Sequence, residues 1–217
     1  MSGNDSCPPG ANGYPSDCEL TQGLRERAFA RQDEVSRGYA WKANLTRAAA
    51  IQLLLLDVDG VLTDGSLIFL PDGSEIKAFS SKDGFGLRLV KEAGVEVGII
   101  TARTSAVVQR RAENLGITRL YQGRDNKLEV FSEILAETGL TNEQIAYVGD
   151  DWLDLPILSR VGLAVSVADG TQEVRERVHY VTRAMGGRGA VREVCDLLIE
   201  AKGRRNELLG RYLPGGG

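Results

Sequence analysis

Residues 53–65 read LLLLDVDGVLTDG, an apolar run that passes directly into acidic side chains. The four leucines are typical of a buried strand, and Asp57 and Asp59 follow at the point where that strand ends. Ligands of open parallel sheets bind outside the carboxyl ends of the strands. The stretch therefore predicts a strand that places two carboxylates at a binding site.

From residue 50 onward, short apolar runs alternate with helical periods of about 10 to 15 residues, as in βαβ units. This alternation predicts an α/β fold, a Rossmann-like, mostly parallel sheet flanked by helices. Strands are expected at 52–56, 96–100, 119–121, 144–148 and 162–166. Helices are expected from Asp83 to about Ala93, from Thr104 or Ser105 to Gly116, from Asp125 or Asn126 to Gly139, just after Asp151, and over 190–202.

A small β-hairpin is expected over 67–79, because Pro71-Asp72-Gly73 is a turn tripeptide between two β-like runs. The hairpin is too small to be a lid, so no cap domain is expected. Residues 1–49 are predicted to be a partly disordered extension, since the first 18 are rich in Gly, Pro, Ser, Asn and Asp. Residues 50–203 should form the main domain, and 204–217 a flexible C-terminal tail.

Composition and charge exclude several classes of protein. The net charge is −4 and the basic residues are scattered, so nucleic acid is not expected as a partner. There is no apolar run of about 20 residues and no signal-like start, which predicts a cytoplasmic protein without a membrane partner. A single histidine and three cysteines without CxxC spacing argue against a thiolate or histidine metal centre and a Ser-His-Asp triad.

Polar side chains follow four successive strands of the predicted sheet. Taken singly, each has an ordinary structural alternative: Asp151 would cap the next helix, and Lys127 would be a solvated surface lysine. Coincidence at four strand ends instead indicates a shared site. The residues concerned are Asp57 and Asp59, then Thr101 and Arg103, then Lys127, and finally Asp150 and Asp151.

This set of side chains suits phosphoryl transfer. Crowded carboxylates without His or Cys nearby favour Mg²⁺ as the neutralising cation. Residues two apart on an extended segment point to the same side, so Asp57 and Asp59 can both face one phosphorus atom. One carboxylate can attack it, while the other protonates the leaving alcohol and later activates water. Thr101 and Lys127 are suited to stabilise charge on the transferring group.

The order Asp-x-Asp, Thr, Lys, Gly-Asp-Asp resembles the four motifs of the haloacid dehalogenase superfamily of phosphohydrolases. More narrowly, the chain is similar to its capless subclass that acts on 3-deoxy-octulosonate 8-phosphate, a step of lipopolysaccharide sugar synthesis. The likeness runs from about Ile51 to Lys202. It rests on DVDGVLTDG, KAFSSKDGFGLR, ITART, YQGRDNK, VGDDWLDLP and VTRAMGGRGAVREVCDLL.

The resemblance implies a role for each matching residue. Asp57 would be the nucleophile and a metal ligand, and Asp59 the general acid/base that also ligates metal through its backbone carbonyl. Asp150 would be the third metal ligand, and Thr101 and Lys127 would bind the phosphoryl group. Asp151 and Asp154 would support the metal ligands from behind. Substrate-binding positions are implied at Ser80, Ser81, Lys82, Asp83, Gly84, Arg88, Arg103, Arg111 and Lys127.

Substrate and assembly also follow from the resemblance. A sugar acid with a carboxylate at one end and a phosphate at the other needs guanidinium groups, which Arg88, Arg103 and Arg111 would supply. Capless members assemble as homotetramers in which a neighbour helps to close each site, so the same is expected here, with Mg²⁺ as cofactor.

Three alternatives remain open at this point. The same chemistry would serve a nonulosonate 9-phosphate, and a non-catalytic oligomerisation module would share the fold. A phospho-receiver domain also uses Asp, Thr and Lys around magnesium, but lacks an acid two residues after its acceptor.

The glycine-rich segment 186–190 would either cradle an anion at a helix N-terminus or simply turn the chain.

Overall fold

The computed structural model describes residues 16, 21–22 and 38–213 of the chain. Its central element is a six-stranded sheet in the order β5-β4-β1-β6-β7-β8, in which every neighbouring pair is parallel. The predicted α/β fold is therefore confirmed, and β8 is a strand that the sequence did not predict. The strands are β1 Leu53–Leu56, β4 Glu96–Ile100, β5 Arg119–Tyr121, β6 Ile145–Gly149, β7 Leu163–Ser166 and β8 Tyr180–Val181.

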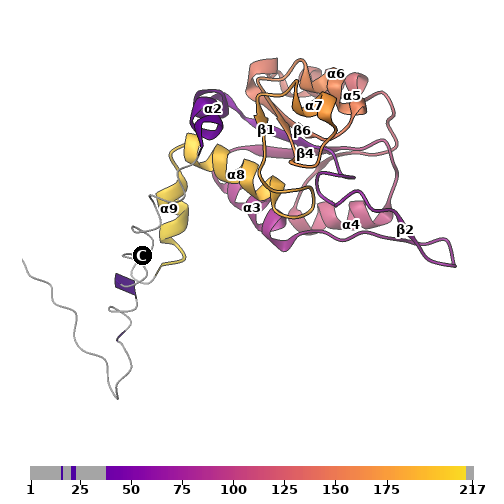
Figure 1. Ribbon diagram of the computed structural model, residues 1–217, viewed down its shortest axis with the longest axis horizontal. Coiled ribbons are helices and arrows are strands. Elements are labelled where there is room, and N and C mark those ends of the chain that lie inside the picture. The colour runs from indigo at the N-terminus through magenta and orange to yellow at the C-terminus, as the bar shows by residue number, and fades with distance from the viewer. Residues whose placement is uncertain (1–15, 17–20, 23–37, 214–217) are drawn as a thin grey trace, which may run out of the picture.

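Helices cover both faces of the sheet (Figure 1). One face is covered by α5 Lys127–Thr138, α6 Leu155–Leu158 and α7 Gln172–Arg175. The other is covered by α2 Tyr39–Ala50, α3 Ser81–Glu92, α4 Ala106–Leu115 and α8 Ala190–Ala201. Two 3₁₀ helices, η2 Asn142–Gln144 and η3 Trp152–Asp154, precede and follow β6, and α9 Arg205–Gly210 comes after α8.

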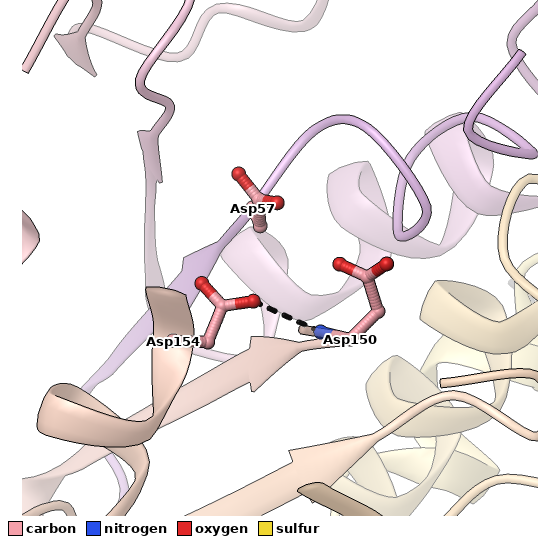
Figure 2. A group of neighbouring side chains, drawn as sticks. All are labelled: Asp57, Asp150 and Asp154. Carbon is pink, nitrogen blue, oxygen red and sulfur yellow. Dashed lines mark hydrogen bonds between the residues drawn. The ribbon is translucent and has the colours of Figure 1, made fainter. Parts of the chain in front are cut away.

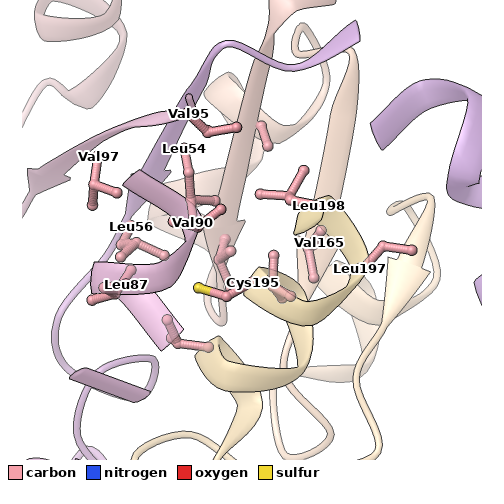
Figure 3. Packing of buried hydrophobic residues seen from close by; sticks show 14 of the residues in the cluster. Leu54, Leu56, Leu87, Val90, Val95, Val97, Val165, Cys195, Leu197 and Leu198 are labelled. Atoms are coloured by element: carbon pink, nitrogen blue, oxygen red, sulfur yellow. The ribbon is translucent and has the colours of Figure 1, made fainter. Parts of the chain in front are cut away.

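The leucine run of β1 is explained by its central place in the sheet. Leu54 and Leu56 pack into the core on the α3 and α8 side, while Leu53 and Leu55 pack into the core on the α5 side. All four side chains are fully buried. Figure 3 shows Leu54 and Leu56 on the side of the sheet where α3 contributes Leu87 and Val90 and α8 contributes Cys195. An uninterrupted apolar strand is what a two-sided environment requires.

The predicted hairpin is present as β2 Ile68–Phe69 and β3 Glu75–Ile76, which pair antiparallel. Its turn contains Gly73 with a positive φ of 81°. Figure 1 shows the hairpin projecting from the body of the molecule at the end opposite to α9. The hairpin therefore lies beside the sheet without covering it, as expected for a chain without a cap domain.

The start of α3 differs from the prediction. Asp83 does not cap the helix that follows β3, because Ser80 occupies that position and accepts a hydrogen bond from the Asp83 N–H. Asp83 lies in the first turn of α3, and its carboxylate instead accepts the N–H groups of Gly189 at 3.2 Å and Arg192 at 2.7 Å. Asp83 thus caps α8, a helix more than a hundred residues away in the chain, which no local pattern reveals.

The helices that flank the sheet domain in the sequence, α2 and α9, pack on its core. Leu208 of α9 is 3% exposed and belongs to the core, so α9 packs on the domain. The flexible C-terminal tail over 204–217 stays a prediction. On α2, Trp41 is buried against Tyr180, with their ring centroids 6.2 Å apart. The expected disorder of the first residues concerns positions that, apart from residue 16, lie outside the described part of the chain. Among the described residues, no helix combines the length and apolarity that crossing a bilayer requires.

Candidate active site

Three carboxylates meet at the carboxyl edge of the sheet (Figure 2). Asp57 directly follows β1, Asp150 directly follows β6, and Asp154 ends η3. One oxygen of each lies within 4.8 Å of an oxygen of the others. β1 and β6 are parallel neighbours, so Asp57 and Asp150 lie at the same end of the sheet. The pairing extends to Asp57 itself, whose N–H donates to the Val148 carbonyl at 3.0 Å.

A pocket of about 180 Å³ opens over this edge. The structure brings together there the predicted site residues that follow strand ends. The predicted residues that line the pocket are Asp57, Asp59, Thr101, Arg103, Lys127, Asp150, Asp151 and Asp154.

Lys127 is a buried lysine, which rules out the solvated-surface alternative. Its side chain is 3% exposed, and its Nζ lies 2.9 Å from Asp57 and 2.6 Å from Asp154. Burial alone would lower the pKa of Lys127, but the charges of these two aspartates raise it. Lys127 therefore stays charged beside the candidate nucleophile, at the pocket wall.

Asp154 has no lone pair left for another ligand. One carboxylate oxygen accepts from Lys127 and, at 2.6 Å, from the Tyr147 hydroxyl. The other accepts the N–H groups of Asp150 at 3.0 Å and Asp151 at 3.2 Å. Since a carboxylate offers about four acceptor positions, Asp154 is fully used in holding Lys127 and the loop after β6. The supporting role expected for Asp154 stays a prediction.

Asp57 and Asp150 carry the charge that a cation would neutralise. Burial raises the pKa of Asp57 to about 6, even though Lys127 lowers it. Burial, followed by the charges of Asp57 and Asp154, raises the pKa of Asp150 to about 7. Hard oxygen ligands crowded in this way fit a divalent cation such as Mg²⁺, which would remove the repulsion that raises both pKa values. The residues present therefore fit the predicted metal.

The glycine-rich segment 186–190 packs against the loop after β1. A Cβ atom on Gly186 would lie 1.7 Å from the carbonyl oxygen of Gly60, and one on Gly187 would lie 2.6 Å from the backbone of Thr63. The Gly187 N–H donates to the Val61 carbonyl at 2.9 Å. These glycines permit a backbone contact that holds the Asp57–Asp59 loop, and the N-terminus of α8 beside them is occupied by Asp83. The anion-cradle alternative is therefore not supported.

Asp59 lies apart from the three-carboxylate cluster. Its side chain forms ion pairs with Lys77, which comes from the hairpin, and with Arg103 at 3.7 Å. Glu75 of β3 contacts both of these cations, Lys77 at 3.3 Å and Arg103 at 3.2 Å. Neither Lys77 nor Glu75 was predicted, and neither was the buried Tyr147. The only signal for Lys77 was its place in the KAFSSKDGFGLR segment.

The remaining predicted substrate positions do not line the pocket. Ser80 caps α3 and accepts from Arg111 through its carbonyl at 3.2 Å, and Arg111 also lies over the Phe79 ring. Arg88 donates to the Asn114 carbonyl at 3.3 Å. Asp151, which was predicted to support the metal ligands, does line the pocket, and it also caps η3 by accepting from the Trp152 N–H at 2.7 Å. The positions outside the pocket lining are Ser80, Ser81, Lys82, Asp83, Gly84, Arg88 and Arg111.

The fold and the site together define a haloacid dehalogenase-like hydrolase, and the family model of that description matches residues 116–192. The 3-deoxy-D-manno-octulosonate 8-phosphate phosphatase KdsC of Escherichia coli K12 is 49% identical over 169 residues, which are 78% of this chain and 90% of the relative. The chain thus belongs to the family of 3-deoxy-D-manno-octulosonate 8-phosphate phosphatases.

Solved structures agree with this assignment. A probable YrbI family phosphatase from Pseudomonas syringae pv. phaseolica superimposes with a TM-score of 0.79 at 49% identity, covering 80% of this chain and 99% of the other. The 3-deoxy-D-manno-octulosonate 8-phosphate phosphatase of Moraxella catarrhalis, solved with a magnesium ion, a phosphate ion and KDO, gives a TM-score of 0.77 at 39% identity. In this case 78% of this chain and 98% of the other are covered.

Proposed function

We propose that the chain is a Mg²⁺-dependent phosphatase that hydrolyses 3-deoxy-D-manno-octulosonate 8-phosphate to 3-deoxy-D-manno-octulosonate and phosphate. The observation that carries the proposal is the placement of Lys127 between Asp57 and Asp154, beside the carboxylate of Asp150. The names of the relatives support the substrate, and the magnesium and phosphate ions of the Moraxella structure support the cofactor and the chemistry.

The metal site would be formed by Asp57, Asp150 and the backbone carbonyl of Asp59. Bound there, Mg²⁺ would supply positive charge to the oxygens of the phosphoryl group. Lys127 and the Thr101 hydroxyl, both buried in the pocket wall, act on the same oxygens.

In the first half-reaction, a carboxylate oxygen of Asp57 forms a bond to phosphorus as the bond from phosphorus to the ester oxygen breaks. Asp59 gives its proton to the departing alkoxide, which leaves as the sugar alcohol. The product on the enzyme is an aspartyl-phosphate at Asp57, and Asp59 is left as a carboxylate.

In the second half-reaction, Asp59 takes a proton from a water molecule as the water oxygen bonds to phosphorus. The bond from the Asp57 oxygen to phosphorus breaks, so that inorganic phosphate leaves and both aspartates return to their starting states. One residue serves as acid and then as base, which makes the orientation of the Asp59 carboxylate important in both steps.

The proposal includes a homotetramer in which neighbours complete each site. Arg88 and Arg111 lie outside the pocket of their own subunit, although the resemblance assigns them to substrate binding. The hairpin exposes large apolar side chains, with Ile68 at 48% and Phe69 at 59% exposure, which is typical of a protein interface. We further propose 50–203 as the phosphatase domain, with α2 and α9 packed on it. The cytoplasmic location stays a prediction.

Phosphate release across sugar-acid phosphates, with Mg²⁺ or with a chelator, tests the activity. We expect release from the octulosonate 8-phosphate only with the metal, and none from the Asp57→Asn variant. Faster release from a nonulosonate 9-phosphate would reassign the substrate. No release from any ester would leave the chain as a non-catalytic module.

Subunit mixing tests the shared site. Copies with Asp57→Asn and copies with Arg111→Ala, each poorly active alone, should regain activity when they are unfolded together and refolded. In mixed tetramers an intact nucleophile can then meet an intact arginine from its neighbour. Activity that never exceeds the average of the two variants would show that Arg111 serves its own subunit.

A further inference from the structure

Lys77 is a second enclosed lysine beside the active site. It follows β3 in the hairpin, and its side chain is 1% exposed. Burying an ammonium group is costly unless it is paired and hydrogen-bonded. Its Nζ meets this requirement by contacting a carboxylate oxygen of Asp59 and, at 3.3 Å, Glu75. The hairpin therefore inserts a charged side chain toward the proposed acid/base.

The groups around Asp59 alternate in charge. One Asp59 oxygen faces Lys77, and the other lies 3.7 Å from the Arg103 guanidinium. Glu75 contacts both cations, so two positive and two negative groups form a closed cluster. Each oxygen of Asp59 is thus held from a different element, the hairpin on one side and the loop after β4 on the other. Such contacts restrict the rotation of the carboxylate.

Each of the two buried lysines contacts a different aspartate of the Asp57–Asp59 pair. Lys127 lies 2.9 Å from Asp57 and contacts Asp154 at 2.6 Å. Lys77 contacts Asp59 and does not line the pocket. Lys127 is thus placed to touch the phosphoryl group, whereas Lys77 can act on the reaction only through Asp59.

We propose that Lys77 is a positioning residue that holds the Asp59 carboxylate in the orientation needed for proton transfer in both half-reactions. The inference rests on the proposed phosphatase function and extends it to the hairpin. Lys77 exchanges no proton itself. It fixes where the Asp59 oxygen lies when that oxygen protonates the alkoxide, and again when it accepts a proton from water.

The first experiment compares Lys77→Met with Lys77→Arg, and with Lys42→Met as the control on the exposed face of α2. On the octulosonate 8-phosphate with Mg²⁺, we expect Lys77→Met to lower kcat about 10- to 100-fold. This loss is smaller than the roughly 10²- to 10⁴-fold contribution of general acid–base catalysis, because Asp59 itself is still present. KM should change less than about threefold, Lys77→Arg should recover part of kcat, and Lys42→Met should behave as the unaltered protein.

A double-variant cycle tests whether Lys77 acts through Asp59. If it does, Lys77→Met should cause little further loss in an Asp59→Asn background, within about twofold. Losses that multiply in the double variant would overturn the inference, as would a kcat for Lys77→Met within twofold of that for Lys42→Met. If Lys77→Met does not fold, as judged by circular dichroism, the same cycle is run with Lys77→Gln.

The second readout separates the two half-reactions. The nitrophenolate leaving group of p-nitrophenyl phosphate needs little protonation, so with this ester the variant should be slowed mainly in the step that activates water. Acid quenching of Lys77→Met should then trap more phosphoenzyme than quenching of the unaltered protein; equal amounts would contradict the role. Absence of phosphate release from the unaltered protein would instead overturn the proposed function and this inference with it.

Discussion

Tyr147 shows how one buried hydroxyl can organise the active site. It lies within β6, is fully buried, and donates to Asp154 at 2.6 Å while accepting from Lys127 at 3.3 Å. Burial raises its pKa well above the usual value, so the phenol stays neutral and remains a donor. It therefore helps to fix the carboxylate that positions Lys127.

Replacing this hydroxyl has a measurable cost. Tyr147→Phe should lower the free energy of unfolding by about 1.5–3 kcal/mol, the range for hydrogen bonds to charged groups, and should lower kcat. Tyr121→Phe is a matched control, because its hydroxyl donates to the exposed Glu137 at 3.0 Å and should cost less than about 1 kcal/mol. Urea unfolding of both variants makes the comparison, and equal costs would show that Asp154 does not depend on Tyr147.

The raised pKa values of Asp57 and Asp150 predict how pH affects stability. In metal-free protein the folded state keeps protons that an unfolded aspartate, with a pKa of 3.8, has lost. The free energy of unfolding should therefore fall as the pH rises from about 4 to about 7. Mg²⁺ binds the carboxylate form, so it should stabilise the protein more at pH 8 than at pH 5.

Urea unfolding with chelator and with Mg²⁺ at several pH values measures both effects. A variant with Asp57→Asn and Asp150→Asn is the control, since its metal-free stability should change less across the same pH range. A steeper fall in this variant than in the unaltered protein would assign the pH dependence to other groups.

At the scale of elements, the contact between the 186–190 segment and the loop after β1 has no room for a side chain. Gly186→Ala should cost about 1–3 kcal/mol or more, since the added methyl group meets the Gly60 backbone. It should also lower kcat, because the same loop carries Asp57 and Asp59. Gly210→Ala, where a Cβ would meet no atom within 4 Å, is the matched control. Thermal unfolding and phosphate release compare the two, and equal behaviour would contradict this role of the segment.

Local patterns predicted the elements whose signals lie within a few residues. The βαβ alternation gave β1, β4, β5, β6 and β7, and glycines with positive φ end α4 and α5 where expected. The two-residue strand β8 is too short for any periodicity to show. Helix α9 has only six residues, and no local pattern predicts that its Leu208 packs into the core.

The residues of the candidate site also fall into those that local sequence patterns predict and those that they do not. Residues that directly follow a strand were predictable, because strand order alone brings them to one edge. Tyr147 was not, since within the apolar segment QIAYVG it has the pattern of a core residue. Lys77 reaches Asp59, and Glu75 reaches Lys77, only through the path of the hairpin, and Asp83 caps α8 through a contact between distant helices. Tertiary contacts of this kind leave no mark in sequence spacing.

For the whole molecule, the exposed hairpin predicts an assembly that can be disrupted. Ile68→Asp should convert the expected tetramer into smaller species, because it would bury a charge in the interface. Tyr39→Asp, at an exposed apolar residue on α2, is the control and should leave the assembly intact. Light scattering after size exclusion measures both. A tetramer that persists in Ile68→Asp would place the interface elsewhere.

In the hairpin (Figure 1), exposed apolar residues lie on both strands, and Lys77 directly follows the second strand. If the hairpin forms the proposed interface, a substitution that suits a new neighbouring subunit would also shift Lys77, the lysine that contacts Asp59. Quaternary structure and reaction rate should be inherited as a linked pair of traits. Homologues that lost one would be expected to have rebuilt the other.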